Sequence, residues 1–170
     1  MPHIHKIYDF VVSVFIVFEA RVLLIYHKKY KEWLPIGGHV ELDEDPEEAL
    51  YREIQEECGL KVTILAPTPK IKHAGVKPLP TPSFMDSHKI SKAHRHVAFV
   101  YFGVSASDDV HLHEREHREF RWASLKELKN PEYKLTKSIH FYCKEALKAA
   151  KKHPTSFRRS KLPGDKSDEQ

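Results

Sequence analysis

Apolar and polar positions recur with two different periods along this chain, and the two periods divide it into strands and helices. Residues 8–17 are apolar and rich in valine, isoleucine and phenylalanine, which predicts a buried strand. After a short turn at Glu19-Ala20, residues 21–26 predict a second strand that returns beside the first. Three later runs predict further strands, at residues 60–65, 94–104 and 119–123.

The middle of the chain carries the signals of a helix. Asp45 is a favoured capping residue, Pro46 suits the first helical position, and Glu48 stands three residues after the cap. Gly59 is the expected end, because glycine adopts the left-handed conformation that terminates helices. At about 100° per residue, one face of this helix is apolar and is expected to be buried: Leu50, Ile54 and Cys58.

The rest of the chain sets the domain limits. Residues 66–93 contain five prolines and predict a long loop, which in a compact domain is usually functional or disordered. Residues 151–170 carry many charges and few large apolar groups, so we expect a disordered, basic C-terminal tail after a folded domain at residues 1–150. From Pro131 onward, apolar residues at three- and four-residue steps predict a second helix that closes the core: Leu135, Ile139, Tyr142, Cys143 and Leu147.

Short strands around one helix, with a second helix late in the chain, indicate an α+β fold. A length of 170 residues allows one domain with a sizeable core, and no apolar run approaches the roughly 18–20 residues of a membrane helix. Residues 1–6 lack the features of a signal peptide, so a cytoplasmic location is the default expectation. The two cysteines fall in predicted helices, which favours reduced packing residues over ligands.

Three carboxylates gather at the end of the first helix. Glu53, Glu56 and Glu57 fall within an arc of roughly 100° on one face, where like charges repel one another. A divalent cation converts this repulsion into coordination, and hard Mg²⁺ prefers oxygen ligands. Arg52 is placed to steady one carboxylate through a charge-assisted hydrogen bond. The alternative is an ordinary acidic surface helix, and the wider spacing decides between the two.

That spacing is specific. Glycines and charged residues stand at fixed intervals, in this order: Gly38, five residues, Glu44, seven residues, Arg52-Glu53, an apolar residue, any residue, Glu56-Glu57, any residue, Gly59 and apolar Leu60. The pattern resembles the signature of the Nudix (MutT-like) hydrolase family at every defined position. The segment Trp33-Leu34-Pro35, just before the glycines, is similar to the aromatic-Leu-Pro entry of that family.

The resemblance implies a Nudix-type α/β/α sandwich with a mixed central sheet, spanning about residues 7 to 148. It implies Mg²⁺, with Mn²⁺ as a possible substitute, held by Glu53, Glu56 and Glu57. A backbone carbonyl at Gly37 or Gly38 is expected to add a ligand, because glycine allows close backbone approach.

Family members often carry one more metal-site glutamate ahead of the last aromatic-rich strand. Glu116 fits best, six residues before Trp122, and Glu119 is the runner-up. By resemblance Arg52 orients Glu53, and Glu44 braces the loop and the helix.

The general base stays open among three candidates. Glu53 or Glu56 acts directly, or Glu116 acts through water.

The implied reaction is hydrolysis of the diphosphate linkage in a nucleoside diphosphate joined to a group X, with a nucleoside triphosphate as one candidate. One alternative is a Nudix-fold module that binds a nucleotide without turnover. A second is an enzyme similar to isopentenyl-diphosphate isomerases, which requires a catalytic cysteine ahead of the motif, and neither Cys58 nor Cys143 precedes it. The expected partner is a small nucleotide derivative, with no membrane.

The net charge of +4 is too mild to argue for a nucleic-acid polymer. The oligomeric state, monomer or homodimer, is left open.

A few other residues invite functional interpretations. His94 and His96 share one side of a predicted strand, but zinc needs four converging ligands and the sequence shows no convergence. Phe84 or Tyr101 can stack on a base, although packing is the commoner role. The basic segment at residues 27–31 is either a solvated turn or a rim that faces phosphate.

Overall fold

The computed structural model describes residues 7–112 and 117–153. Its two helices are α1 (Pro46–Glu57) and α2 (Lys137–Lys152), with short 3₁₀ turns η1 (Glu127–Lys129) and η2 (Pro131–Tyr133). The strands among these residues are β1 (Tyr8–Phe18), β2 (Arg21–His27), β3 (Glu32–Leu34), β4 (Ile36–His39), β5 (Val62–Ile64), β6 (Phe84–Ser91), β7 (His94–Ser105) and β8 (His117–Ser124).

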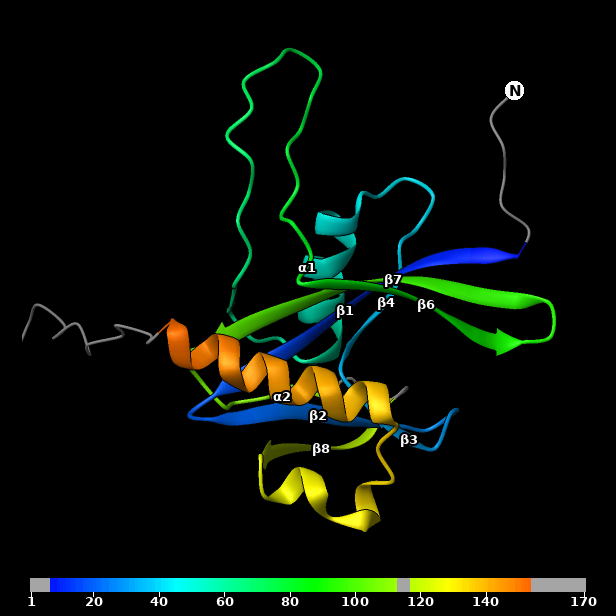
Figure 1. Ribbon diagram of the computed structural model, residues 1–170, viewed down its shortest axis with the longest axis vertical. Coiled ribbons are helices and arrows are strands. Elements are labelled where there is room, and N and C mark those ends of the chain that lie inside the picture. Colours follow the sequence, from blue (N-terminus) through cyan, green and yellow to red (C-terminus); the bar gives the residue numbers. More distant parts are fainter. Residues whose placement is uncertain (1–6, 113–116, 154–170) are drawn as a thin grey trace, which may run out of the picture.

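β1 organises a single mixed sheet (Figure 1). It runs parallel to β7 over ten residue pairs, from Tyr8 opposite Arg95 to Val17 opposite Val104. It is antiparallel to β2 at one end and to β4 at the other. The path β3-β2-β1-β7-β5 is extended by β8, which pairs with β2, and by β6, which pairs with β7. The predicted mixed central sheet is therefore confirmed.

One helix covers each face of this sheet. Successive residues of β1 point to opposite sides, so β1 packs against both helices. One core joins Val12, Val14 and Ile16 of β1 to the apolar face of α1. The other joins Val11, Phe15 and Val17 to α2. The three residues predicted to be buried beneath the first helix are all in the first core: Leu50 is 0% exposed, Ile54 3% and Cys58 0%. With one helix on each face of the sheet, the arrangement is an α/β/α sandwich.

Some elements differ from the prediction. β6 lies inside the proline-rich segment expected to be a loop, and the loop proper ends at Ser83. Most β6 side chains are exposed, so the strand lacks an apolar alternation and is stabilised by its pairing with β7. β3 and β4 are too short to show a period. α2 begins at Lys137, with Thr136 as its cap, because Pro131 opens a separate 3₁₀ turn.

Within the described ranges, neither helix has the length and apolar character needed to cross a bilayer. The predicted tail was to begin at residue 151, but α2 continues to Lys152, and residues 154–170 lie outside the described residues.

Candidate active site

The helix that carries the carboxylates begins where the sequence places it. The Asp45 side chain accepts hydrogen bonds from the backbone N–H groups of Glu47 (2.9 Å) and Glu48 (3.1 Å). The Glu48 carboxylate accepts one from the Asp45 N–H (2.9 Å), which completes a capping box. At the other end Gly59 has a φ of 63°, in the left-handed region expected of a helix stop.

Two glycines bring the backbone of β4 against this helix. A Cβ on Gly38 would lie 2.2 Å from Oε1 of Glu53, so only glycine lets the backbone approach this carboxylate so closely. Gly37 has a φ of 149°, and a Cβ there would lie 2.2 Å from the carbonyl oxygen of Val12. The Gly37 N–H also donates to Oε2 of Glu57 (2.8 Å). The glycine pair and the helix end therefore form one unit.

Arg52 ties the acidic residues together. Its Nε and Nη2 donate to the two carboxylate oxygens of Glu44, at 2.5 and 3.0 Å. Its Nη1 donates to Glu53 (2.8 Å) and to Glu56 (3.1 Å), and Nη2 also reaches the carbonyl oxygen of His39 (3.0 Å). The planar guanidinium suits such multiple contacts. The Arg52 guanidinium thus holds three carboxylates and the backbone of β4 in a fixed arrangement.

The surroundings of Glu53 oppose ionisation of its carboxyl group. Burial raises its pKa to about 7, with the charges of Glu57 and Glu56 adding to the shift and the hydrogen bond from Arg52 opposing it. A carboxylate that is hard to ionise beside two others is a site where an added cation relieves repulsion. The all-oxygen donor set of Glu53, Glu56 and Glu57, with the Gly38 backbone beside it, fits Mg²⁺ or Mn²⁺.

Glu57 has a partner that the sequence did not reveal. Nε2 of His117 lies 2.7 Å from Oε1 of Glu57, and both side chains are buried. A β-bulge between Ile25 and His27 shifts the register of β8, so that His117 pairs with His27. Phe120 pairs with Ile25, and strand residues alternate between faces. His117 is three residues from Phe120, so it would face away from α1 if the bulge did not shift the register.

The structure brings six of the seven proposed site residues together: Glu44, Arg52, Glu53, Glu56, Glu57 and Gly38. The seventh, Glu116, lies outside the described residues. The runner-up, Glu119, lies 3.5 Å from Arg121, and its strand position, next to Phe120, points it away from α1.

Both aromatic candidates for base stacking have packing roles. Tyr101 is 1% exposed, and its hydroxyl donates to the carbonyl oxygen of Pro80 (3.4 Å). Phe84 packs against Phe141 and Tyr142 of α2. Packing, the commoner role, is confirmed for both.

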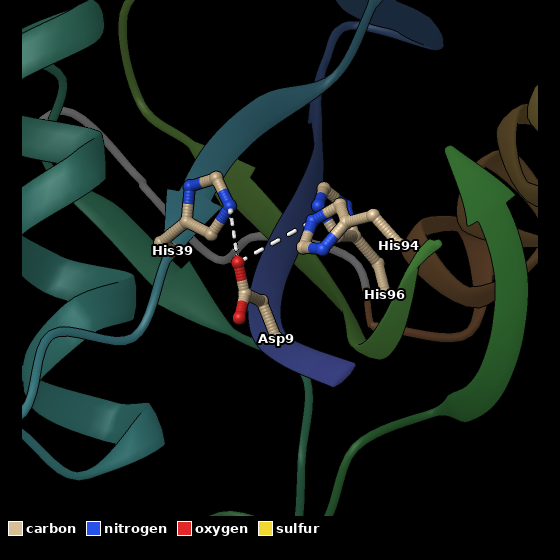
Figure 2. A group of neighbouring side chains, drawn as sticks. All are labelled: Asp9, His39, His94 and His96. Atoms are coloured by element: carbon tan, nitrogen blue, oxygen red, sulfur yellow. Dashed lines mark ion pairs between the residues drawn. The ribbon is translucent and has the colours of Figure 1, made fainter. Parts of the chain in front are cut away.

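His94 and His96 do converge with other potential ligands. His39 of β4 and Asp9 of β1 lie beside them on the sheet (Figure 2). The sequence did not show this convergence, because the strand pairing that joins these residues has no local signal. This Asp/His cluster (Asp9, His39, His94 and His96) is separate from the carboxylates of α1 and is considered below.

Comparisons with known proteins agree with this geometry. A family model for the NUDIX domain matches residues 8–144, whereas a comparison with curated proteins gave no match. A NUDIX-family hydrolase from Clostridium perfringens is 37% identical, over 85% of this chain and 98% of its own, with a TM-score of 0.74. A MutT NUDIX hydrolase from Burkholderia pseudomallei is 25% identical over 81% and 96% of the two chains (TM-score 0.59). An Ap4A hydrolase from C. elegans, 19% identical over 86% and 96% (TM-score 0.53), shows the fold alone. The chain belongs to the Nudix family and is a Nudix hydrolase.

Proposed function

We propose that this protein hydrolyses the diphosphate linkage of a nucleoside diphosphate joined to a group X, using Mg²⁺ held by Glu53, Glu56 and Glu57. The observation that carries the proposal is the contact between the Gly38 backbone and the Glu53 carboxylate, beside two further carboxylates of the same helix. Nudix hydrolases generally use divalent metals, and this donor set is built of oxygens alone. When bound, the ion neutralises the diphosphate and lowers the pKa of a water molecule.

The protein's own contribution is to hold these oxygens still. Arg52 fixes Glu53 and Glu56, and its bidentate contact with Glu44 anchors it to the loop before α1. His117 and the Gly37 N–H hold the two oxygens of Glu57. Such preorganisation means that the ligands need not be ordered again when substrate binds.

The raised pKa of Glu53, about 7, lies in the range where a general base works well at neutral pH. This pKa belongs to the metal-free protein, and a bound cation would lower it, so Glu53, Glu56 and Glu116 all stay candidates for the general base.

The group X is left open by the fold. Similar folds occur in a dihydroneopterin triphosphate pyrophosphohydrolase of E. coli, 17% identical, and in a UDP-X diphosphatase, also 17% identical. Neither substrate transfers to this chain at that identity. A nucleoside triphosphate is retained as one candidate. The cytoplasmic location also stays a prediction.

The isomerase alternative is disfavoured by the state of both thiols. Cys58 and Cys143 are each 0% exposed. Burial raises the pKa of the Cys58 thiol to about 11 and that of Cys143 to about 12. A catalytic cysteine must reach its substrate, and a nucleophilic one must also form a thiolate, which neither buried thiol is placed to do.

The test is a screen of the purified protein with Mg²⁺ against nucleoside triphosphates, dinucleoside polyphosphates, nucleotide sugars and capped RNA. Release of phosphate or pyrophosphate is scored, with Glu53→Gln as a matched control that keeps the side-chain shape. We expect turnover of at least one class by the wild type and a loss of orders of magnitude in the variant. A wild type that binds a nucleotide tightly but turns nothing over would instead identify a binding module.

A further inference from the structure

Three adjacent strands bring the Asp/His cluster together at one end of the sheet. Asp9 of β1 pairs with His96 of β7, and Val11 of β1 pairs with His39 of β4. Residues directly opposite one another, and residues two apart on a strand, share a face. All four members, including His94, therefore project from the same face. Figure 2 shows the three imidazoles around the Asp9 carboxylate.

The separations in the cluster approach those of a coordination sphere. The candidate ligand atoms all lie within 4.8 Å of one another. Oδ2 of Asp9 is 3.3 Å from Nε2 of His94 and 3.6 Å from Nε2 of His39. A tetrahedral ion with bonds of 2.0–2.1 Å separates its ligand atoms by roughly 3.3–3.4 Å. Small side-chain rotations thus suffice to convert the cluster into four ligands.

We propose that Asp9, His39, His94 and His96 bind one borderline divalent transition-metal ion, best matched by Zn²⁺. Three imidazole nitrogens and one carboxylate are a donor set that zinc favours, whereas Mg²⁺ prefers oxygen. The two metal sites of the chain therefore differ in ligand chemistry as well as in position.

A second layer of contacts supports His96. The ring of His88 on β6 lies edge-on to His96, with 5.4 Å between the centroids. Nδ1 of His88 is 2.7 Å from one oxygen of Asp86, and the hydroxyl of Tyr142 donates to the other oxygen at 2.7 Å. α2 thus fixes Asp86, which fixes His88 against the cluster. Outer contacts that restrain the orientation of ligands are typical of protein metal sites.

The proposed ion has a structural consequence for β4. Four protein ligands leave no open position in a tetrahedral zinc site, which is the pattern of structural rather than catalytic zinc. Ligation would clamp β4 to β1 and β7 through His39. That residue directly follows Gly38, and its carbonyl oxygen accepts a hydrogen bond from Arg52 (3.0 Å). The ion would hold in place the strand that supplies the glycine backbone to the carboxylates.

The test measures zinc affinity directly and does not depend on hydrolysis. The full-length protein is stripped of metal and titrated with Zn²⁺ against a chromogenic chelator. We expect one tight site per chain, weakened at least about 100-fold in His94→Ala and in His96→Ala, because even loss of a supporting contact costs up to that factor. His111→Ala is the control, since His111 likewise lies near an aspartate, 3.6 Å from Asp109, but outside the cluster.

Further arms separate the two metal sites and exclude misfolding. Glu57→Gln should leave zinc affinity unchanged, and Co²⁺ should give the intense visible absorption of tetrahedral coordination. Asp9→Asn, which keeps the side-chain shape, should also weaken binding, with circular dichroism as a check on folding. Zn²⁺ should raise the Tm of the wild type but not that of His94→Ala. Zinc binding that survives in both histidine variants, or that is lost in Glu57→Gln or His111→Ala, overturns the proposal. So does a wild type that does not bind zinc tightly.

Discussion

Single residues at the glycine pair have separable roles. A Cβ at Gly38 would meet the end of the Glu53 side chain, which can move. A Cβ at Gly37 would meet the backbone of Val12, at a φ of 149° that L-residues rarely adopt. The first change disturbs the site, and the second disturbs the fold.

Gly38→Ala is therefore expected to lower kcat about 100-fold, because displacing a reacting group by about 1 Å costs that much. Its Tm should change little. Gly37→Ala should instead lower the free energy of unfolding by roughly 1–3 kcal/mol. Kinetics and thermal melting of the two variants side by side check this. Equal effects of both substitutions on stability would contradict the distinction.

The Glu53 pKa predicts how stability depends on pH in the metal-free protein. Its folded-state pKa of about 7 lies above the ordinary value of 4.5, so between these pH values the folded state holds the proton more tightly. Unfolding free energy should therefore fall as pH rises from about 4.5 to 7, by on the order of 3 kcal/mol, and then level off. Denaturant titrations in EDTA measure this slope, which Glu53→Gln should flatten. A slope unchanged in the variant would assign it to other groups.

At the scale of elements, the bulge in the β2–β8 pair determines a site contact. It turns His117 toward α1, where the imidazole meets the buried Glu57 carboxylate. Nδ1 of His117 has no hydrogen-bond partner among the described residues, so its interaction with Glu57 is the main polar contact seen there.

His117→Ala should lower the free energy of unfolding by roughly 2 kcal/mol, because a buried carboxylate loses a strong hydrogen bond. It should also weaken Mg²⁺ binding, since Glu57 loses one of its two restraints. Urea denaturation and metal titration check the two effects. A variant as stable as the wild type would mean that the pair contributes nothing to stability.

The loop between β5 and β6 extends beside α1 as a long excursion from the sheet (Figure 1). Lys77 attaches it to the start of that helix, with Nζ 2.7 Å from Asp45, 3.4 Å from Glu47 and 3.4 Å from Glu48. Exposed ion pairs contribute little to global stability. We expect these ion pairs to restrain the loop instead.

Lys77→Ala should leave Tm nearly unchanged but speed cleavage of the loop by thermolysin, which cuts before apolar residues such as the exposed Ile71 and Val76. Lys72→Ala, in the same loop, is the control. Identical cleavage rates in both variants would show that Lys77 does not restrain the loop.

At the scale of the whole molecule, both cores and six of the seven proposed site residues lie within the described residues. The family model ends at residue 144, and α2 ends at Lys152. Composition alone predicts that the residues beyond cannot bury enough apolar surface to offset the cost of ordering.

Deletion of residues 155–170 is therefore expected to leave Tm and small-substrate hydrolysis nearly unchanged. Melting curves and steady-state kinetics of the truncated chain measure both. A large loss in either would mean that these residues contact the folded domain.

The sequence by itself determined what depends on local spacing. The cap at Asp45, the stop at Gly59 and the carboxylate face of α1 all follow from positions within one helix, where geometry relates neighbours at three- and four-residue steps. The strands β1 and β7 could also be predicted from local sequence, because a strand that is buried on both faces is a long apolar segment.

Tertiary structure alone decided what depends on strand pairing. His117 meets Glu57 across 60 residues because of a bulge, and β6 exists because it pairs with β7. The Asp/His cluster joins residues 9, 39, 94 and 96 because β4 and β7 flank β1 in one register. Register is a property of two segments together, and a shift of one residue would send these side chains to the opposite face. The pattern of residues along one segment therefore cannot predict the register of a strand pair.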